Sequence, residues 1–264
     1  MPVTALEHVH VLCAEPHWHT IDFFSDLHLD STQPATLQAL QRYLQHSPAQ
    51  ALFILGDLFE AWPGDDAIDD AGEALNEAIV EALRALSEAG TRLHLMHGNR
   101  DFLLGEEFAT RCGALLLPDP YVLTLPEWQF VLSHGDSLCT DDREYQTFRA
   151  QVRSAEWRRA FLGKPLPERK AIAHALRQKS EESKNEKLQH AQSYLMDLNA
   201  AATDDFLRDH GYATFIHGHT HHPATHDHLV DGIHVERWVL ADWHEQRGEY
   251  LCWDGKRLQR EALL

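Results

Sequence analysis

The chain has 264 residues, which is long enough for one large α/β domain with an insertion. Its net charge of −18 argues against nucleic acid as the main partner, because phosphate backbones bind basic surfaces. The four cysteines form no Cys-x-x-Cys pair, which fits a reducing compartment, and no apolar run approaches the ~18 residues that cross a bilayer.

Residues 1–19 contain four histidines but no lysine or arginine, which argues against a secretory signal. We interpret this stretch as an N-terminal extension outside the core, with disorder as one alternative, and infer no function for it.

From residue 20 onward, short apolar strands alternate with amphipathic helices. A strand over 20–25 is followed by a helix over 34–46, and a strand over 52–55 by a helix over 71–89. A third strand over 93–96 leads into a turn and a short helix. This β-α-β-α-β order implies a largely parallel sheet covered by helices.

Three further apolar runs, at 115–117, 121–125 and 130–132, follow one another without helices between them, which indicates a mixed or second sheet. We therefore predict an α/β fold of two packed mixed β-sheets flanked by helices. The later strands are predicted at 213–216, 233–240, 248–253 and 257–261.

Residues 142–211 interrupt this pattern, because they are polar and helical in character. Within them, residues 149–187 hold eleven of the 23 lysines and arginines and five acids, a local charge of +6, so the remainder carries −24. An acidic body with a basic insert suggests that one surface binds an anion. We predict that 142–211 is a helical cap inserted into a core formed by 20–141 and 212–264.

Residues of the kinds that bind metals follow five of the predicted strands. Side chains at strand ends converge on one edge of a sheet, where open α/β folds bind their ligands. Seven such residues suffice for two adjacent divalent ions that share the Asp57 carboxylate, and two such ions can clamp the attacking and leaving oxygens of phosphoryl transfer. The predicted metal ligands are Asp26, His28, Asp57, Asn99, His134, His217 and His219.

Each motif alone has an ordinary structural interpretation, such as a surface pair for Asp26 and His28 or a turn at Asn99. All five in this order rarely arise for structural reasons. A mixed oxygen and nitrogen set without thiolate suits Mn²⁺ or, less tightly, Mg²⁺, Fe²⁺ or Co²⁺. For His221 and His222, the sequence leaves open whether they support the ligands or are merely exposed.

This order of motifs resembles the calcineurin-like metallophosphoesterase superfamily over residues 20–222, and the resemblance implies its αββα sandwich. Within it, the chain is similar to the UDP-2,3-diacylglucosamine diphosphatase family of lipid A biosynthesis. Arg100 stands where most of the superfamily has a histidine acid, and an arginine holds charge on phosphate without titrating. The closer resemblance lies in 54–62, 64–66, 97–105, 134–142 and 217–221.

The resemblance implies a two-metal hydrolase that cleaves UDP-2,3-diacylglucosamine to UMP and 2,3-diacylglucosamine 1-phosphate (lipid X). One metal would be held by Asp26, His28, Asp57 and His219. The other would be held by Asp57, Asn99, His134 and His217. Substrate contacts would come from Asn99, Arg100, Asp142, Ser180, Lys187 and His217. Lys184 stands where the family has asparagine, and it shares a helix face with Ser180 and Lys187, so we include it.

The run 157–179 mixes aromatic and aliphatic side chains with seven basic ones. It is compatible with an ordinary cap helix, or with an acyl-chain groove whose basic rim faces an anionic membrane, and the implied lipid substrate favours the second. We therefore expect a peripheral protein at the cytoplasmic face of the bacterial inner membrane, without nucleic acid or an obligate protein partner.

Two alternatives remain open from the sequence. One is a soluble metallophosphodiesterase or phosphatase acting on nucleotides or phosphoproteins, against which the apolar, basic insertion and Arg100 argue. The other is a catalytically silent, metallophosphoesterase-like scaffold, against which the presence of all seven predicted ligands argues.

Overall fold

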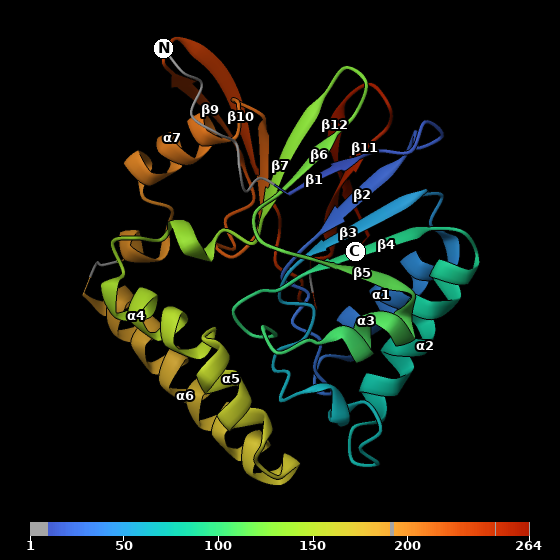
Figure 1. Ribbon diagram of the computed structural model, residues 1–264, viewed down its shortest axis with the longest axis vertical. Helices are drawn as coiled ribbons and strands as arrows, with labels where there is room; N and C mark the ends of the chain where they lie inside the picture. The colour runs from blue at the N-terminus through green and yellow to red at the C-terminus, as the bar shows by residue number, and fades with distance from the viewer. Residues whose placement is uncertain (1–9, 191–192, 246, 264) are drawn as a thin grey trace.

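The computed structural model describes residues 10–190, 193–245 and 247–263, which build two packed β-sheets with helices around them (Figure 1). The strand order is β12-β11-β2-β3-β4-β5 in the first sheet and β1-β6-β7-β8-β10-β9 in the second. The first sheet contains β2 (Ile21–Phe24), β3 (Ala51–Leu55), β4 (Arg92–Met96), β5 (Ala114–Leu117), β11 (Glu249–Trp253) and β12 (Leu258–Ala262). The second contains β1 (Val11–Cys13), β6 (Tyr121–Thr124), β7 (Gln129–Ser133), β8 (Thr214–His217), β9 (Thr225–Val230) and β10 (Ile233–Val239).

Alternation of side chains along β2 and β3 explains why β3 is apolar throughout and why β2 is apolar except for the buried Asp22. Phe23 and Phe53 point into the core between the two sheets and stack with ring centroids 5.4 Å apart. Their neighbours Phe24 and Ile54 point the other way, into the core beneath the helices. A strand buried on both faces has no solvated positions, so its residues are predominantly hydrophobic.

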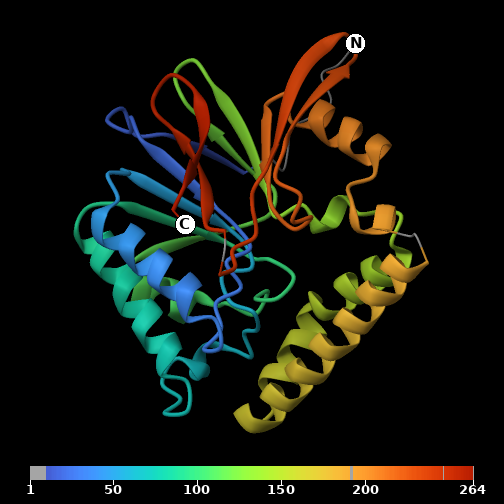
Figure 2. The same cartoon turned by 180° about the vertical axis from the view of Figure 1, so that it is seen from behind.

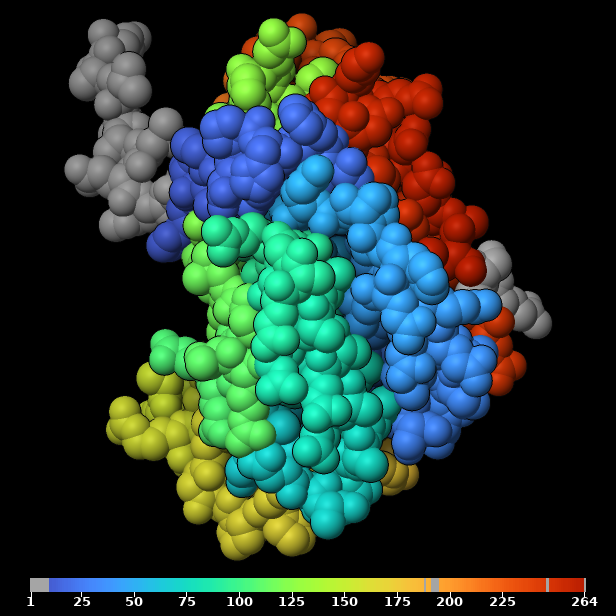
Figure 3. All heavy atoms as spheres, turned by 90° about the vertical axis from the view of Figure 1, so that its right-hand side faces the viewer, coloured from blue at the N-terminus to red at the C-terminus, as the bar shows by residue number. Residues whose placement is uncertain are grey.

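Three helices cover the outer face of the first sheet: α1 (Pro34–His46), α2 (Ala74–Glu88) and α3 (Glu106–Cys112). Proline opens α1 in its first turn, where a missing N–H costs nothing. Figure 3 shows α1 and α2 side by side on this face. Together with the two sheets, this layer confirms the predicted fold class, two packed mixed sheets flanked by helices.

The segment between β7 and β8 holds four helices: α4 (Arg143–Val152), α5 (Ala155–Leu162), α6 (Leu166–Gln189) and α7 (Ala200–Asp209). The first three project together to one side of the sheets (Figure 2), whereas α7 lies against the second sheet. Leu207 of α7 is fully buried and packs in one cluster with Phe215 and Val131. The predicted cap therefore includes one helix that belongs to the packing of the core.

Two strands were not predicted. β1 lies within the stretch interpreted as an extension, and it pairs in parallel with β6, so residues 11–13 belong to the second sheet. Residues 1–9 of that stretch lie outside the described part of the chain. β9 is an edge strand of mixed polar character, Thr-His-Asp-His-Leu-Val, and it lacks the apolar run that marks a buried strand.

β5 does not belong to the same sheet as β6 and β7, the two strands that follow it in the sequence. It pairs in parallel with β4 and closes the first sheet, while β6 and β7 pair with each other in the second. Among the described residues, no helix is both long and apolar enough to traverse a bilayer.

Candidate metal centre

The carboxyl ends of five strands carry loops that meet between the two sheets. β2, β3 and β4 run parallel to one another, as do β7 and β8. Asp26, Asp57 and Asn99 follow the first three strands, and His134 and His219 follow the other two. Backbone hydrogen bonds tie the loops together: Asp26 N donates to the Gly56 carbonyl at 3.1 Å, and Gly218 N donates to the His134 carbonyl at 3.1 Å.

The backbone is strained at this site. Among the described residues other than glycine, seven have a positive φ, and five of these belong to the site. L-residues rarely adopt this conformation, so such strain is commonly kept where a side chain has a functional task. The five are Asp26, His28, Asp57, His219 and His221, with φ between 47° and 67°.

Two groups of potential ligand atoms share the Asp26 carboxylate. In the first, atoms of Asp26, His28 and His221 lie within 4.8 Å of one another. In the second, atoms of Asp26, Asp57 and His134 meet the same limit. Two groups of ligand atoms that share a residue have the geometry expected of two adjacent cation sites.

Asn99 connects two of the histidines. Its Oδ1 lies 3.0 Å from His134 Nε2 and 2.8 Å from His219 Nδ1. Of the seven predicted ligands, the structure thus brings together six: Asp26, His28, Asp57, Asn99, His134 and His219.

His217 lies apart from this cluster, contrary to the prediction. Its Nδ1 donates to the Gly218 carbonyl at 2.8 Å, and its Nε2 accepts from Arg237 Nη1 at 3.1 Å, so both ring nitrogens have partners. Burial, and then the positive charge of Arg237, lowers the pKa of His217 to about 3. His217 is the last residue of β8, whereas His219 and His221 lie in the loop beyond it.

His221 lies beside Asp26 and His28, where the sequence predicted His219. Its Nε2 lies 3.3 Å from Asp26 Oδ1 and 3.3 Å from His28 Nε2, and its Nδ1 lies 3.4 Å from Asp242 Oδ2. The two histidines of this stretch that face the cluster are therefore His219 and His221, whereas the sequence predicted His217 and His219. The positive φ of His221 was not readable from the sequence.

Charge at the centre favours a bound cation. Burial opposes ionisation of Asp26, but the hydrogen bond and charge of His221, with smaller contributions from His134 and His28, hold its pKa well below the ordinary value. Burial, and then the charge of His134, lowers the pKa of His219 to about 3, which leaves a neutral imidazole. An ionised carboxylate and neutral imidazoles are the forms that bind metals.

The residues present fit a divalent metal. Asp26 Oδ1 is buried, and ring nitrogens of His221 and His28 lie 3.3 Å and 3.7 Å from it. A buried carboxylate is costly unless its charge is compensated, and a cation held between it and these imidazoles would provide that compensation. The donor set of carboxylates, an amide oxygen and imidazoles is one that Mn²⁺ and similar ions accept.

Asp101 holds the loops in place, a task that the sequence did not reveal. Its buried carboxylate accepts from the backbone N–H groups of Gly98 at 2.8 Å, Leu58 at 2.8 Å and Asp57 at 3.2 Å. Gly98 is required here, because a Cβ at this position would lie 2.0 Å from Asp57 Oδ1. The Gly-Asn-x-Asp motif thus fixes both Asn99 and its neighbouring loop.

A family model described as calcineurin-like phosphoesterase matches residues 19–223, which include every loop of this centre. The chain belongs to the calcineurin-like phosphoesterase family. Its two-sheet fold and the metal-ligand set at the strand ends agree with that assignment.

Three curated relatives of this chain carry the same name and are similar to it over most of their length. It is 53% identical over 236 residues, 88% of this chain and 92% of the other, to the UDP-2,3-diacylglucosamine hydrolase of Aromatoleum aromaticum. It is 46% identical to the protein of the same name from Chromohalobacter salexigens, with 85% and 89% of the two chains covered. It is also 46% identical to that of Aeromonas hydrophila, with 92% and 98% covered.

Beside the metal centre of the phosphoesterase, Arg100 lies among acidic groups. Its Nη2 donates to Glu181 Oε1 of α6 at 3.1 Å, and its Nε lies 3.7 Å from Glu60 Oε1. Its backbone N–H donates to Asp57 Oδ1 at 2.7 Å. Burial of the guanidinium is outweighed by the charges of Glu60, Asp57 and Glu181, so the pKa of Arg100 is raised and the group stays charged.

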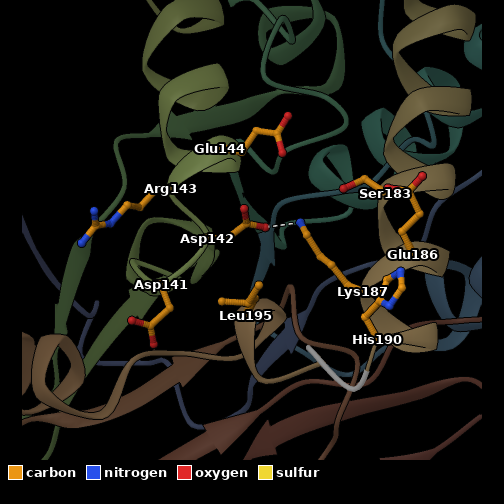
Figure 4. Close-up of a pocket in the computed structure, with 9 residues that line it drawn as sticks. All are labelled: Asp141, Asp142, Arg143, Glu144, Ser183, Glu186, Lys187, His190 and Leu195. Carbon is orange, nitrogen blue, oxygen red and sulfur yellow. Dashed lines mark hydrogen bonds and ion pairs between the residues drawn. The ribbon is translucent and has the colours of Figure 1, made fainter.

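A cavity of about 300 Å³ opens where α4 meets the C-terminal part of α6 (Figure 4). Asp142 and Lys187 point toward each other across it and form an ion pair. The other residues that line it are Asp141, Arg143, Glu144, Ser183, Glu186, His190 and Leu195.

The remaining predicted substrate residues, Ser180 and Lys184, have exposed side chains on α6. Neither lines the cavity, whereas Ser183 does.

Arg169, a residue of the basic run 157–179, is buried, although that run was expected to form an exposed basic rim. It is only 2% exposed and forms an ion pair with Asp66. It therefore anchors α6 to the core and offers no charge to a membrane.

Proposed function

We propose that this chain hydrolyses the pyrophosphate of UDP-2,3-diacylglucosamine, giving UMP and 2,3-diacylglucosamine 1-phosphate. The observation that carries the reaction type is the cluster of two ligand groups around Asp26 at the strand ends. The substrate is inferred from relatives named UDP-2,3-diacylglucosamine hydrolase, with at least 46% identity over most of both chains in the three described above.

We assign Asp57 to both ions, because its Oδ2 lies 3.8 Å from Nε2 of His28 and 3.8 Å from Nε2 of His134. Asp26, which both ligand groups contain, is assigned to the ion beside His28 and His221. One ion would be held by Asp26, His28, Asp57 and His221. The other would be held by Asp57, Asn99, His134 and His219. Bound there, divalent ions would lower the pKa of a water molecule and offset negative charge on the reacting phosphate.

Arg100 suits the leaving group of this reaction. Hydrolysis forms a P–O bond from water to the phosphorus nearest uridine and breaks the bond to the bridging oxygen, which leaves with the lipid phosphate. That leaving group is a phosphomonoester, a stable anion that needs no proton. A permanently charged guanidinium can bind the pyrophosphate, whereas a histidine acid would have no task here.

Substrate recognition beyond the pyrophosphate would fall to the helices α4–α6. Asp142 and Lys187 provide a charged pair at the cavity, and Ser180 and Lys184 add polar groups on α6. Leu162 is 41% exposed and Arg159 is exposed on α5, so apolar and basic groups share this projecting element. Such a surface is suited to a lipid presented at an anionic membrane.

We propose the identity of the metal ion and the cellular location from chemistry alone. Mn²⁺ is the proposed physiological ion, because the ligand set combines carboxylate, amide and imidazole donors. The proposed location is the cytoplasmic face of the bacterial inner membrane, with peripheral attachment, since the substrate is a lipid.

Release of UMP from UDP-2,3-diacylglucosamine tests the proposal. We expect turnover with Mn²⁺, loss of turnover with chelator and recovery when Mn²⁺ is restored. A metal-loaded protein that releases no UMP from this substrate, yet hydrolyses a simple nucleotide diester, would contradict the proposed substrate.

A further inference from the structure

Glu60 is a buried carboxylate that no step above uses. It follows β3 in the loop of Asp57, and its backbone N–H donates to the Leu29 carbonyl at 3.2 Å. It is 8% exposed, in a position where an unpaired negative charge would be costly.

The partners of Glu60 come from three functional parts of the molecule. One oxygen, Oε2, lies 3.0 Å from Nδ1 of His28, a ligand in the proposed metal centre. The other, Oε1, lies 2.9 Å from Arg177 Nη1 of α6 and 3.7 Å from Nε of Arg100. The carboxylate therefore joins the metal centre, the proposed phosphate contact and the projecting helices.

The ring nitrogen of His28 that lies next to Glu60 is Nδ1, and this determines which nitrogen can bind a metal. A proton on Nδ1 is favoured by the nearby carboxylate, and it leaves Nε2 free as the ligand atom. Nε2 is the atom directed at the cluster, 3.7 Å from Asp26 Oδ1 and 3.8 Å from Asp57 Oδ2. A carboxylate in this position also fixes the orientation of the ring.

We propose that Glu60 is a positioning residue, which holds His28 in its metal-binding tautomer and ties α6 to the metal centre through Arg177. This inference rests on the proposed two-metal function, because it requires an ion at His28. It adds to that function a physical link between the projecting helices and the metal site.

Titration of Mn²⁺ into chelator-stripped protein, followed by the paramagnetic resonance signal of free Mn²⁺, tests the first part without any activity assay. Glu60→Ala is expected to weaken one of the two sites by roughly 10–100-fold, the usual effect of removing such a partner. Glu60→Gln, which keeps the volume and an acceptor oxygen, is expected to lose less. If Glu60→Ala fails to fold, an unchanged affinity in Glu60→Gln and in Arg177→Met/Glu60→Gln would overturn the proposal.

A control and a double mutant separate positioning from general support. Asp70→Asn removes another ion pair between α6 and the core, that of Lys170, and should leave both sites unchanged. In a His28→Gln background, Glu60→Ala should have little further effect, because the two residues act as one unit. Wild-type affinity in Glu60→Ala, an equal loss in Asp70→Asn, or fully additive losses with His28→Gln would each overturn the proposal.

Arg177→Met tests the link to α6. We expect unchanged Mn²⁺ binding with a KM for UDP-2,3-diacylglucosamine raised several-fold, and unchanged hydrolysis of a small chromogenic diester. Equal losses on both substrates would contradict the link. If the wild-type protein binds two Mn²⁺ through Glu60-supported His28 but releases no UMP, the proposed substrate fails while the role of Glu60 stands.

Discussion

His219 and His221 illustrate how a local backbone conformation determines which histidines face the cluster. Both lie in the left-handed region, with φ of 67° and 59°, and both turn toward the carboxylate of Asp26 or the amide of Asn99. His217, in the same short stretch, is still part of β8 and points to Arg237 instead. Three histidines within five residues therefore have two different tasks.

The first prediction separates these histidines. His221→Ala should weaken one metal site by roughly 10-fold or more, because a ligand is lost. His217→Gln should lose some stability but keep two equivalents of metal, since Gln can still accept from Arg237. Metal analysis of the two purified variants, with thermal unfolding as a check on folding, distinguishes them. Loss of metal in His217→Gln with full retention in His221→Ala would restore the original assignment.

A second prediction concerns Arg100. Arg100→Lys keeps the charge but loses the planar fork, and Arg100→His should not substitute for it, because the leaving group needs no acid. A well-oriented transition-state contact is typically worth about 10²–10³ in rate, and we expect losses of this order in kcat/KM for UMP release. Near wild-type turnover in Arg100→His would indicate that a general acid operates here.

Much of the residue-level site was predictable, since six of the seven predicted ligands meet in the cluster. His217 was predicted in place of His221 because His-x-His can be read in two registers within His-Gly-His-Thr-His, as 217 and 219 or as 219 and 221, and the end of β8 at His217 distinguishes them. Glu60 and Asp101 were not predicted, because a carboxylate that positions a neighbour carries no spacing signal of its own.

At the scale of elements, ion pairs near the two ends of α6 tie it to the core and to the start of α4. Arg169 and Lys170 pair with Asp66 and Asp70 near its start, whereas Lys187 pairs with Asp142 near its end. The same helix thus has structural ion pairs at one end and a cavity at the other.

The third prediction uses these two ends. Lys187→Met should raise the KM for UDP-2,3-diacylglucosamine several-fold and spare the hydrolysis of a small diester, because remote contacts position the reacting phosphorus. Lys170→Met, on the same helix, is the matched control and should change neither. The two substrates are assayed on each metal-loaded variant. An equal loss on both substrates in Lys187→Met would show that this pair only supports the fold.

Sequence periodicity predicted the elements that are buried on one or both faces, such as β3 and α2, because their apolar residues repeat at a fixed spacing. It missed β1 and β9, which are edge strands with exposed or polar side chains. It also included α7 in the cap, since helical character alone does not say which surface a helix covers. Packing of Leu207 against the second sheet decides that point.

For the whole molecule, the metal centre joins the two sheets. The first sheet supplies Asp26, Asp57 and Asn99 and the second supplies His134 and His219, so a bound ion cross-links both layers. Binding to the folded state alone stabilises a protein by about 2.7 kcal/mol when the free ion stands at 100 times its dissociation constant.

The fourth prediction follows from this linkage. Chelation should lower the Tm by roughly 5–10 °C, given about 2–4 °C per kcal/mol for a chain of this size. Asp57→Ala, which removes the shared carboxylate, should abolish turnover and show little response of the Tm to Mn²⁺. Scanning calorimetry with and without chelator measures both proteins. A metal-dependent rise in Tm for Asp57→Ala equal to that of the wild type would contradict the shared role of Asp57.

Hydrolysis of UDP-2,3-diacylglucosamine in ¹⁸O-labelled water tests the central claim most directly, because it reports the substrate and the bond broken in one measurement. The account predicts Mn²⁺-dependent release of UMP that carries the label, with none in the lipid 1-phosphate. Label in the lipid product, or UMP release that persists when the metal is removed, would contradict it.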